Sequence, residues 1–168
     1  MNLPYWSTCY HEAGHAVVAV VLRRGLVRAC AWSKKQWIDG DRLSGWTVYR
    51  RHRALNRRVA RDQDWAQRDL LTTLAGPVAQ ALACGRERGN AGDWFTANDL
   101  IDWMNYRSAL SAGEAQRLLR DAKNEVRILL RGRWPAVVAV ARALYRQHRL
   151  TGAQVRRIVG AVEKGPTQ

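Results

Sequence analysis

Tyr10 to Ala19 read YHEAGHAVVA, and this stretch decides how the rest of the chain is organised. His11 and His15 are four residues apart, so on a helix they lie on one face, one turn apart. Two imidazoles at that spacing can place nitrogens on a single metal ion at about 2.0–2.1 Å, the usual distance for zinc. Glu12 can then reach a water in an open position of the metal and act on it as a general base.

The residues that follow indicate that this helix is buried. Ala16 to Leu22 read AVVAVVL, an almost continuous apolar run, and Ala13 and Gly14 keep the helix slim beside the histidines. A bare HExxH pattern also arises by chance on surface helices. Unpaired imidazole and carboxylate groups on a buried helix would be costly, however, and a bound metal removes that cost. We therefore predict a Zn²⁺ site on this helix.

Length and composition predict one globular domain. The chain has 168 residues, of which 47% are hydrophobic, and we assign 1–164 to the domain and 165–168 to a tail. No apolar run approaches the roughly 20 residues that span a bilayer, and no secretory signal pattern is visible. We therefore expect a soluble cytoplasmic protein. The three cysteines include no Cys-x-x-Cys pair, which predicts buried free thiols rather than a disulfide framework.

The net charge of +14 is the most unusual property of the composition. Such a charge can indicate binding to nucleic acid or to acidic partners. Most of the arginines are spread at helical spacings, as on solvated faces, and no nucleic-acid-binding motif accompanies them. A nucleic-acid partner is therefore allowed but not favoured, and a basic surface that prefers acidic protein substrates is a comparable alternative.

The periodicity of apolar residues predicts a mainly α-helical chain with a small β-sheet after the first helix, an α+β fold. Capping boxes at Ser111–Glu114 and Thr151–Gln154 open two of the helices, and Pro77 implies a kink or a restart inside another. The expected helices span about 4–24, 65–84, 93–109, 112–131, 134–147 and 151–161. The expected strands span 27–32 and 43–50, joined by a polar loop over 33–42.

The second strand, LSGWTVYR, has two interpretations. It is either an ordinary strand of a small sheet or an exposed edge that holds an extended peptide by backbone pairing. The second interpretation gives a substrate-binding segment made of Gly45, Trp46, Thr47, Val48 and Tyr49. His52 and His148 have no metal-ligand spacing around them, so we expect both to be exposed and unligated.

Laid side by side, these segments resemble the zinc peptidase domain of the FtsH family of AAA proteases. YHEAGHAVVA is followed by LSGWTVYR, similar to the family's Gly-x-Thr strand, and by LLTTLAGPVAQALACG, similar to its Leu-Gly-Gly-Arg-Ala-Ala-Glu-Glu helix. Gly92-Asp93 and Ala97 are similar to the family's Asn-Asp-Leu-x-x-Ala-Thr, and ARALYRQHRLTGAQVRRIV to its final pair of helices. Order and spacing agree over nearly the whole chain.

The resemblance implies a third metal ligand, an aspartate near the start of the helix that follows the glycine-rich loop. Asp93 has the family's spacing, eight residues after Gly85 and four before Ala97. Asp99 copies the Asn-Asp-Leu letters but lies too far from Gly85. We favour Asp93 as the ligand beside His11 and His15. Either aspartate is also explained by helix capping or by the helix dipole.

The sequence also departs from the family. Gln80 stands where the family usually has a glutamate, and Pro77 replaces a basic residue. No Walker loop accompanies the peptidase-like segments, so this chain would not unfold substrates with ATP by itself.

The resemblance implies a stand-alone zinc metalloendopeptidase that cleaves unfolded or flexible polypeptides. It allows for an ATPase or unfoldase partner acting in trans and for an oligomer. The alternative is a degenerate peptidase fold that serves as a zinc-stabilised regulatory or nucleic-acid-binding protein. The intact Glu12 argues against it, because a purely structural zinc site needs no general base. General proteolysis and cleavage of one specific partner remain equal alternatives.

Overall fold

The computed structural model describes residues 3–38, 40–50, 60–86, 91–105 and 110–164. Within these ranges the chain forms six helices and one three-stranded antiparallel sheet, an α+β fold as predicted. The helices are α1 (Leu3–Val21), α2 (Ala60–Cys84), α3 (Ala91–Met104), α4 (Ala112–Gly132), α5 (Trp134–Gln147) and α6 (Gly152–Lys164). The strands are β1 (Leu26–Ile38), β2 (Asp41–Tyr49) and β3 (Arg149–Thr151).

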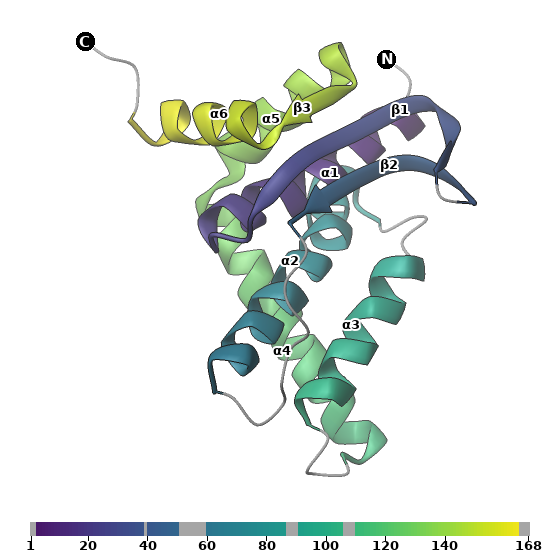
Figure 1. The fold of residues 1–168 in the computed structure, drawn as a ribbon, viewed down its shortest axis with the longest axis vertical. Coiled ribbons are helices and arrows are strands. Elements are labelled where there is room, and N and C mark those ends of the chain that lie inside the picture. Colours follow the sequence, from purple (N-terminus) through teal and green to yellow (C-terminus); the bar gives the residue numbers. More distant parts are fainter. Residues whose placement is uncertain (1–2, 39, 51–59, 87–90, 106–109, 165–168) are drawn as a thin grey trace.

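Helix α1 lies at the centre of the molecule. It packs against α2 and α5 and against the sheet, with α2, α3 and α4 on one side and α5 and α6 on the other (Figure 1). Its small residues explain how it is enclosed, because Ala13, Ala16 and Ala19 are fully buried. At Gly14 the backbone of α2 is so close that an added Cβ would overlap the carbonyl oxygen of Ala75. Central burial of the HExxH helix is therefore confirmed.

The sheet has the strand order β2-β1-β3, so β2 is an edge strand. Strands β1 and β2 form a long hairpin, and its pairing is interrupted between Ala31↔Gly45 and Gln36↔Leu43. Four residues of β1 therefore oppose only Ser44 of β2, an irregular bulge larger than the usual two-against-one kind. The predicted loop over 33–42 is wrong, because most of these polar residues belong to the two strands of the hairpin.

Two other features of the secondary structure were not resolved by the sequence. Helix α2 continues through Pro77 as one helix, so the restart did not occur. Strand β3 was not predicted, and it pairs with β1 through Leu150↔Ala29. Both predicted capping boxes are confirmed, at Ser111–Glu114 and at Thr151–Gln154.

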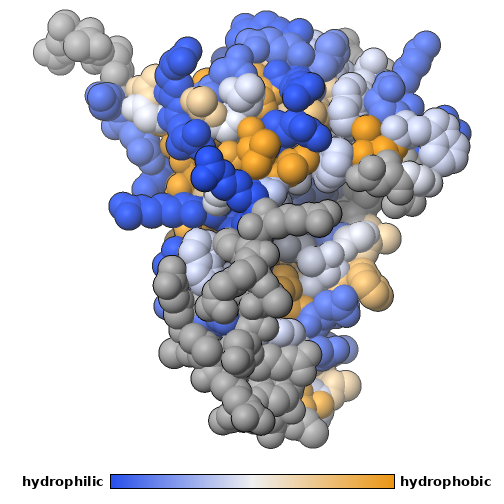
Figure 2. Space-filling model, viewed as in Figure 1, coloured by the Kyte–Doolittle hydropathy of each residue, from blue (hydrophilic) through white to orange (hydrophobic). Residues whose placement is uncertain are grey.

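The surface is predominantly polar. Among the described residues on the face viewed in Figure 2, hydrophilic ones predominate, with smaller hydrophobic groups between them. Two of the three cysteines are buried free thiols as predicted, whereas Cys84 is exposed at the end of α2, so the prediction is wrong for that residue. Among the described residues, no helix has both the length and the apolar character needed to cross a membrane.

Candidate metal centre

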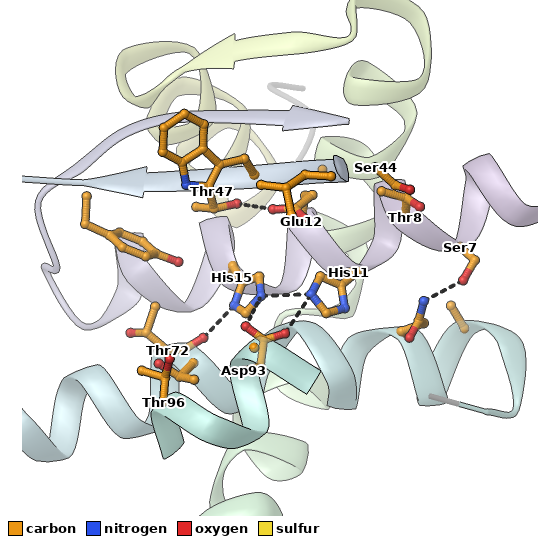
Figure 3. Close-up of a pocket in the computed structure, with 18 of the residues that line it drawn as sticks. Ser7, Thr8, His11, Glu12, His15, Ser44, Thr47, Thr72, Asp93 and Thr96 are labelled. Carbon is orange, nitrogen blue, oxygen red and sulfur yellow. Dashed lines mark hydrogen bonds and ion pairs between the residues drawn. The ribbon is translucent and has the colours of Figure 1, made fainter. Parts of the chain in front are cut away.

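Side chains from α1 and α3 converge on one point. His11 and His15 lie one helical turn apart on α1, and their Nε2 atoms are 3.0 Å from each other. Asp93, the third residue of α3, places Oδ2 3.0 Å from Nε2 of His11 and Oδ1 3.5 Å from Nε2 of His15 (Figure 3). His11, His15 and Asp93 thus form a group that could hold a metal ion, with ligand atoms within 4.8 Å of one another.

The spacing of these atoms fits a small tetrahedral cation. Ligands at about 2.0–2.1 Å from a tetrahedral zinc ion are about 3.3–3.4 Å apart. The two Nε2 atoms are 3.0 Å apart, and the two oxygens of Asp93 lie 3.0 Å from that of His11 and 3.5 Å from that of His15, all close to this value. Two imidazoles and one carboxylate leave the fourth position open, as in catalytic zinc sites and unlike closed structural ones. The residues present therefore fit zinc in a catalytic arrangement.

Hydrogen bonding fixes the orientation of one histidine. Nδ1 of His15 is 2.8 Å from the backbone carbonyl oxygen of Thr72 on α2, so Nδ1 carries the proton and donates it to that oxygen. Without an ion, Nε2 donates a hydrogen bond to Asp93. Because Nδ1 keeps its proton on Thr72, Nε2 is the nitrogen that would lose its proton and offer a lone pair to a metal ion. Nδ1 of His11 has no such partner among the described residues.

The electrostatics of the site favour positive charge. Burial lowers the pKa of His15, but the hydrogen bond and the charge of Asp93 outweigh burial and raise that pKa to about 9. Burial raises the pKa of Asp93, but hydrogen bonds from His11 and His15 hold it well below its usual range. A group of side chains that attracts protons this strongly also attracts a metal cation.

Glu12 lies beside this group, on the adjacent face of α1, and is only 5% exposed. Its Oε2 accepts a hydrogen bond of 2.6 Å from Oγ1 of Thr47 on β2 (Figure 3). Burial raises the pKa of Glu12, opposed by the nearby histidines. Strand β2 therefore holds the predicted base in a fixed orientation, a role that the sequence analysis had not given to Thr47.

Two glycines make room for the functional side chains. A Cβ on Gly76 of α2 would overlap Nε2 of both His11 and His15, so only glycine lets α2 pass this close to the imidazoles. A Cβ on Gly45 of β2 would overlap the carboxylate of Glu12. Gly76 could not be recognised from the sequence alone, because a glycine next to a proline usually indicates a turn or the end of a helix.

A cavity of about 1170 Å³ opens above the histidines and Glu12. Five of the six buried polar residues of the described chain line it: Ser7, Glu12, His15, Thr72 and Gln80. Gln80 donates a hydrogen bond of 2.7 Å to Oγ of Ser7, which accounts for its polar side chain in this position. Buried polar groups are costly unless they are satisfied, so their concentration around one cavity indicates a binding site.

The predicted peptide-binding strand borders this cavity. Gly45, Trp46, Thr47 and Tyr49 line it, and Val48 is absent from the lining. Burial raises the pKa of Tyr49 well above its ordinary value, with Glu12 and Asp93 adding to the effect, so its phenol stays protonated. The assignment of this strand to substrate binding stays a prediction, while Gly45 and Thr47 already contact Glu12.

His148 and Asp99 lie apart from the centre. Asp99 is exposed on α3, six residues beyond Asp93, and does not join the group. His148 is exposed, as predicted, and its Nδ1 contacts the hydroxyl of Tyr5. His52 lies outside the described residues.

Replacing Gly45 by Ala is expected to reduce peptide cleavage about 10- to 100-fold while metal binding is retained. The new methyl group would push the Glu12 carboxylate away from its position next to Thr47, and a small displacement of a catalytic group has effects of this size. Cleavage rates and bound metal should be measured on the same preparations.

The matched control is Gly113→Ala on α4, where nothing lies within 4 Å of the added Cβ. Unchanged cleavage in Gly45→Ala, or an equal loss in Gly113→Ala, would contradict the role assigned to Gly45.

Comparisons of the sequence with protein-family models and with curated proteins find no match. The resemblance to the FtsH family therefore stays a prediction, and only the geometry of the site supports a proposal about function.

Proposed function

We propose that this protein is a zinc-dependent metalloendopeptidase that hydrolyses peptide bonds in unfolded or flexible polypeptide segments. One observation carries the proposal: His11, His15 and Asp93 converge with an open side toward a cavity, and Glu12 lies next to them. A structural zinc site would be closed by a fourth protein ligand and would have no use for a buried glutamate.

His11, His15 and Asp93 would hold the ion. When bound, zinc supplies Lewis acidity, which lowers the pKa of a coordinated water and polarises the peptide carbonyl. Thr72 holds His15 in the tautomer that leaves Nε2 free, and Gly76 leaves the space that both imidazoles need.

Glu12 would transfer the proton. Thr47 occupies Oε2, so Oε1 takes a proton from the water that attacks the carbonyl carbon. The same oxygen then gives this proton to the amine nitrogen as the carbon–nitrogen bond breaks. Atoms balance, because the water is divided between the new carboxylate and the new amine.

Edge strand β2 would hold the substrate in an extended conformation. One side of β2 pairs with β1, and its other side is available to a peptide backbone, which is the common mode of strand addition. A cytoplasmic location, expected from the sequence pattern, and an unfoldase acting in trans, which the resemblance allows, belong to the same proposal.

Removing zinc is expected to abolish cleavage of an unstructured protein such as a reduced, denatured polypeptide, and returning zinc is expected to restore it. The reason is that zinc would be the group that both activates the water and polarises the carbonyl in the proposed reaction. Metal content should be measured with a mass-spectrometric method before and after dialysis against a chelator, in parallel with cleavage. Full cleavage by metal-free protein would reject the proposal. Stoichiometric zinc without any cleavage would instead favour the zinc-stabilised, non-enzymatic alternative.

A further inference from the structure

Three cations that line the cavity form no ion pair with a carboxylate of the described residues. Lys35 of β1, Arg42 of β2 and Arg86, just beyond α2, all border it. Within the described part of the chain, none of the three forms an ion pair. Arg24, the remaining cation of the lining, is paired with Asp69.

The carboxylates of the cavity are already engaged. Asp69 is bonded to Arg24, Asp93 to the two histidines, and Glu12 to Thr47. The described lining residues carry four cations, Arg24, Lys35, Arg42 and Arg86, against the three carboxylates of Glu12, Asp69 and Asp93, a net charge of +1 with both histidines neutral. All three carboxylates are bonded to Thr47, Arg24 or the histidines, so the described part of the cavity presents net positive charge to a ligand.

The three cations gather at one end of the cavity. Helices α1 and α2 run antiparallel, because Ser7 bonds to Gln80 while Arg24 bonds to Asp69. Arg86 follows the end of α2 near Ser7, far from the Arg24 end. Strand β2 runs in the same direction as α1, because Gly45 lies against Glu12 while the backbone nitrogen of Arg50 bonds to the carbonyl oxygen of Gly25, beyond the end of α1. The start of β2, with Arg42, therefore lies toward the Ser7 end.

The bulge of the hairpin explains why Lys35 reaches the cavity. Trp32 to Lys35 oppose only Ser44, so the β1 chain arches at the point where β2 passes the N-terminal part of α1. Bulges next to binding sites commonly redirect a side chain in this way. The arch therefore adds a second cation beside Arg42.

We propose that this end of the cavity is a subsite for acidic side chains, so that the enzyme prefers polypeptides carrying Asp or Glu on one side of the cleaved bond. The inference rests on the proposed function and specifies its substrate class. Gly45 contacts Glu12, and Arg42 lies three residues before it, about 10 Å along the strand. A peptide paired with β2 thus brings a side chain about three residues from the cleaved bond to Arg42. The Arg24 end, already neutralised by Asp69, shows no such preference.

The test uses a peptide that the wild-type protein cleaves, with Glu or Gln placed three residues to either side of the cleaved bond. On one side, Glu is expected to raise kcat/KM about 10-fold over Gln, and on the other side the ratio stays near one. Because the cations are exposed, about 0.5 M salt should remove the preference. Equal kcat/KM for all four peptides at low salt would overturn the inference.

Charge-removing variants test whether the three cations cause the preference for the Glu peptide. In Lys35→Gln/Arg42→Gln/Arg86→Gln the ratio is expected to fall to near one, and the three Glu substitutions at these positions are expected to favour a Lys peptide. The matched control removes the same charge from exposed positions outside the cavity, with Arg117→Gln, Arg120→Gln and Arg157→Gln, and keeps the wild-type ratio. An equal loss of preference in the control would mean that overall charge, and not this subsite, selects the peptides.

A binding measurement tests the subsite for acidic side chains without requiring that the protein cleaves peptides. Fluorescently labelled Glu and Gln peptides are titrated against the Glu12→Gln variant, which needs no catalysis for the measurement. Tighter binding of the Glu peptide supports the subsite even if the wild-type protein cleaves nothing, an outcome that would reject only the peptidase. The same variant is also titrated with a single-stranded oligonucleotide. If the oligonucleotide binds more tightly than the Glu peptide, and this binding is lost when Lys35, Arg42 and Arg86 are replaced, the inference is overturned in favour of nucleic acid.

Discussion

Glu12→Gln is expected to lower kcat/KM for an unstructured polypeptide by about 10³-fold, within the range for loss of a general acid–base group. The substitution keeps the shape of the side chain and its contact with Gly45. It removes the charge that takes the proton from water. Zinc should remain bound in stoichiometric amount, because Glu12 is not among the three convergent ligands.

The control for this change is Glu114→Gln, which keeps the capping box of α4 far from the cavity. It should cleave at the wild-type rate. If Glu12→Gln and Glu114→Gln cleave equally well, Glu12 is not the base, and a water-mediated or purely metal-driven reaction would have to replace it.

Asp93→Asn is expected to abolish cleavage and to weaken zinc binding by more than about 100-fold, beyond what loss of an outer-shell partner causes. The carboxylate contributes both a ligand oxygen and the negative charge that balances the cation. An amide supplies neither in full. Zinc affinity should be measured by competition with a chromogenic chelator, and circular dichroism should show that the helices are retained.

Asp99→Asn supplies the matched control on the same helix. It changes the same functional group on an exposed face of α3 and should leave zinc affinity and cleavage unchanged. Loss of zinc in Asp99→Asn with retention in Asp93→Asn would contradict the assigned ligand set.

The sequence predicted the parts of the site that depend on local spacing. The positions of His11, Glu12 and His15 relative to one another follow from one helical turn, and an apolar run indicated that the helix is buried. Asp93 was favoured over Asp99 because it has the spacing that the resemblance to the FtsH family implies, and the structure brings Asp93, not Asp99, to the histidines.

Two other features of the site depend on a backbone atom or on the absence of a side chain. No pattern in the sequence indicates either of them. The carbonyl oxygen of Thr72 orients His15, yet every residue carries such an oxygen. Gly76 matters because it lacks a Cβ where α2 crosses the imidazoles, and this depends on a helix more than fifty residues away in sequence.

The hairpin is longer than the sequence predicted, because its two strands extend into the expected loop over 33–42. Residues 33–38 are mostly polar and exposed, so they lack the alternation by which strands are recognised. Cross-strand pairs such as Gln36↔Leu43 hold them in the strand instead. Strand β3 is only three residues long and depends on pairing with β1, so its own sequence does not specify it.

The proposed metal ligands come from two helices that are separate in sequence, α1 and α3. An ion held there joins those helices, so part of its binding energy becomes folding energy. Heat resistance and survival against housekeeping proteases would then follow the supply of zinc in the cell. Zinc deficiency would then lower the amount of this protein as well as its proposed activity.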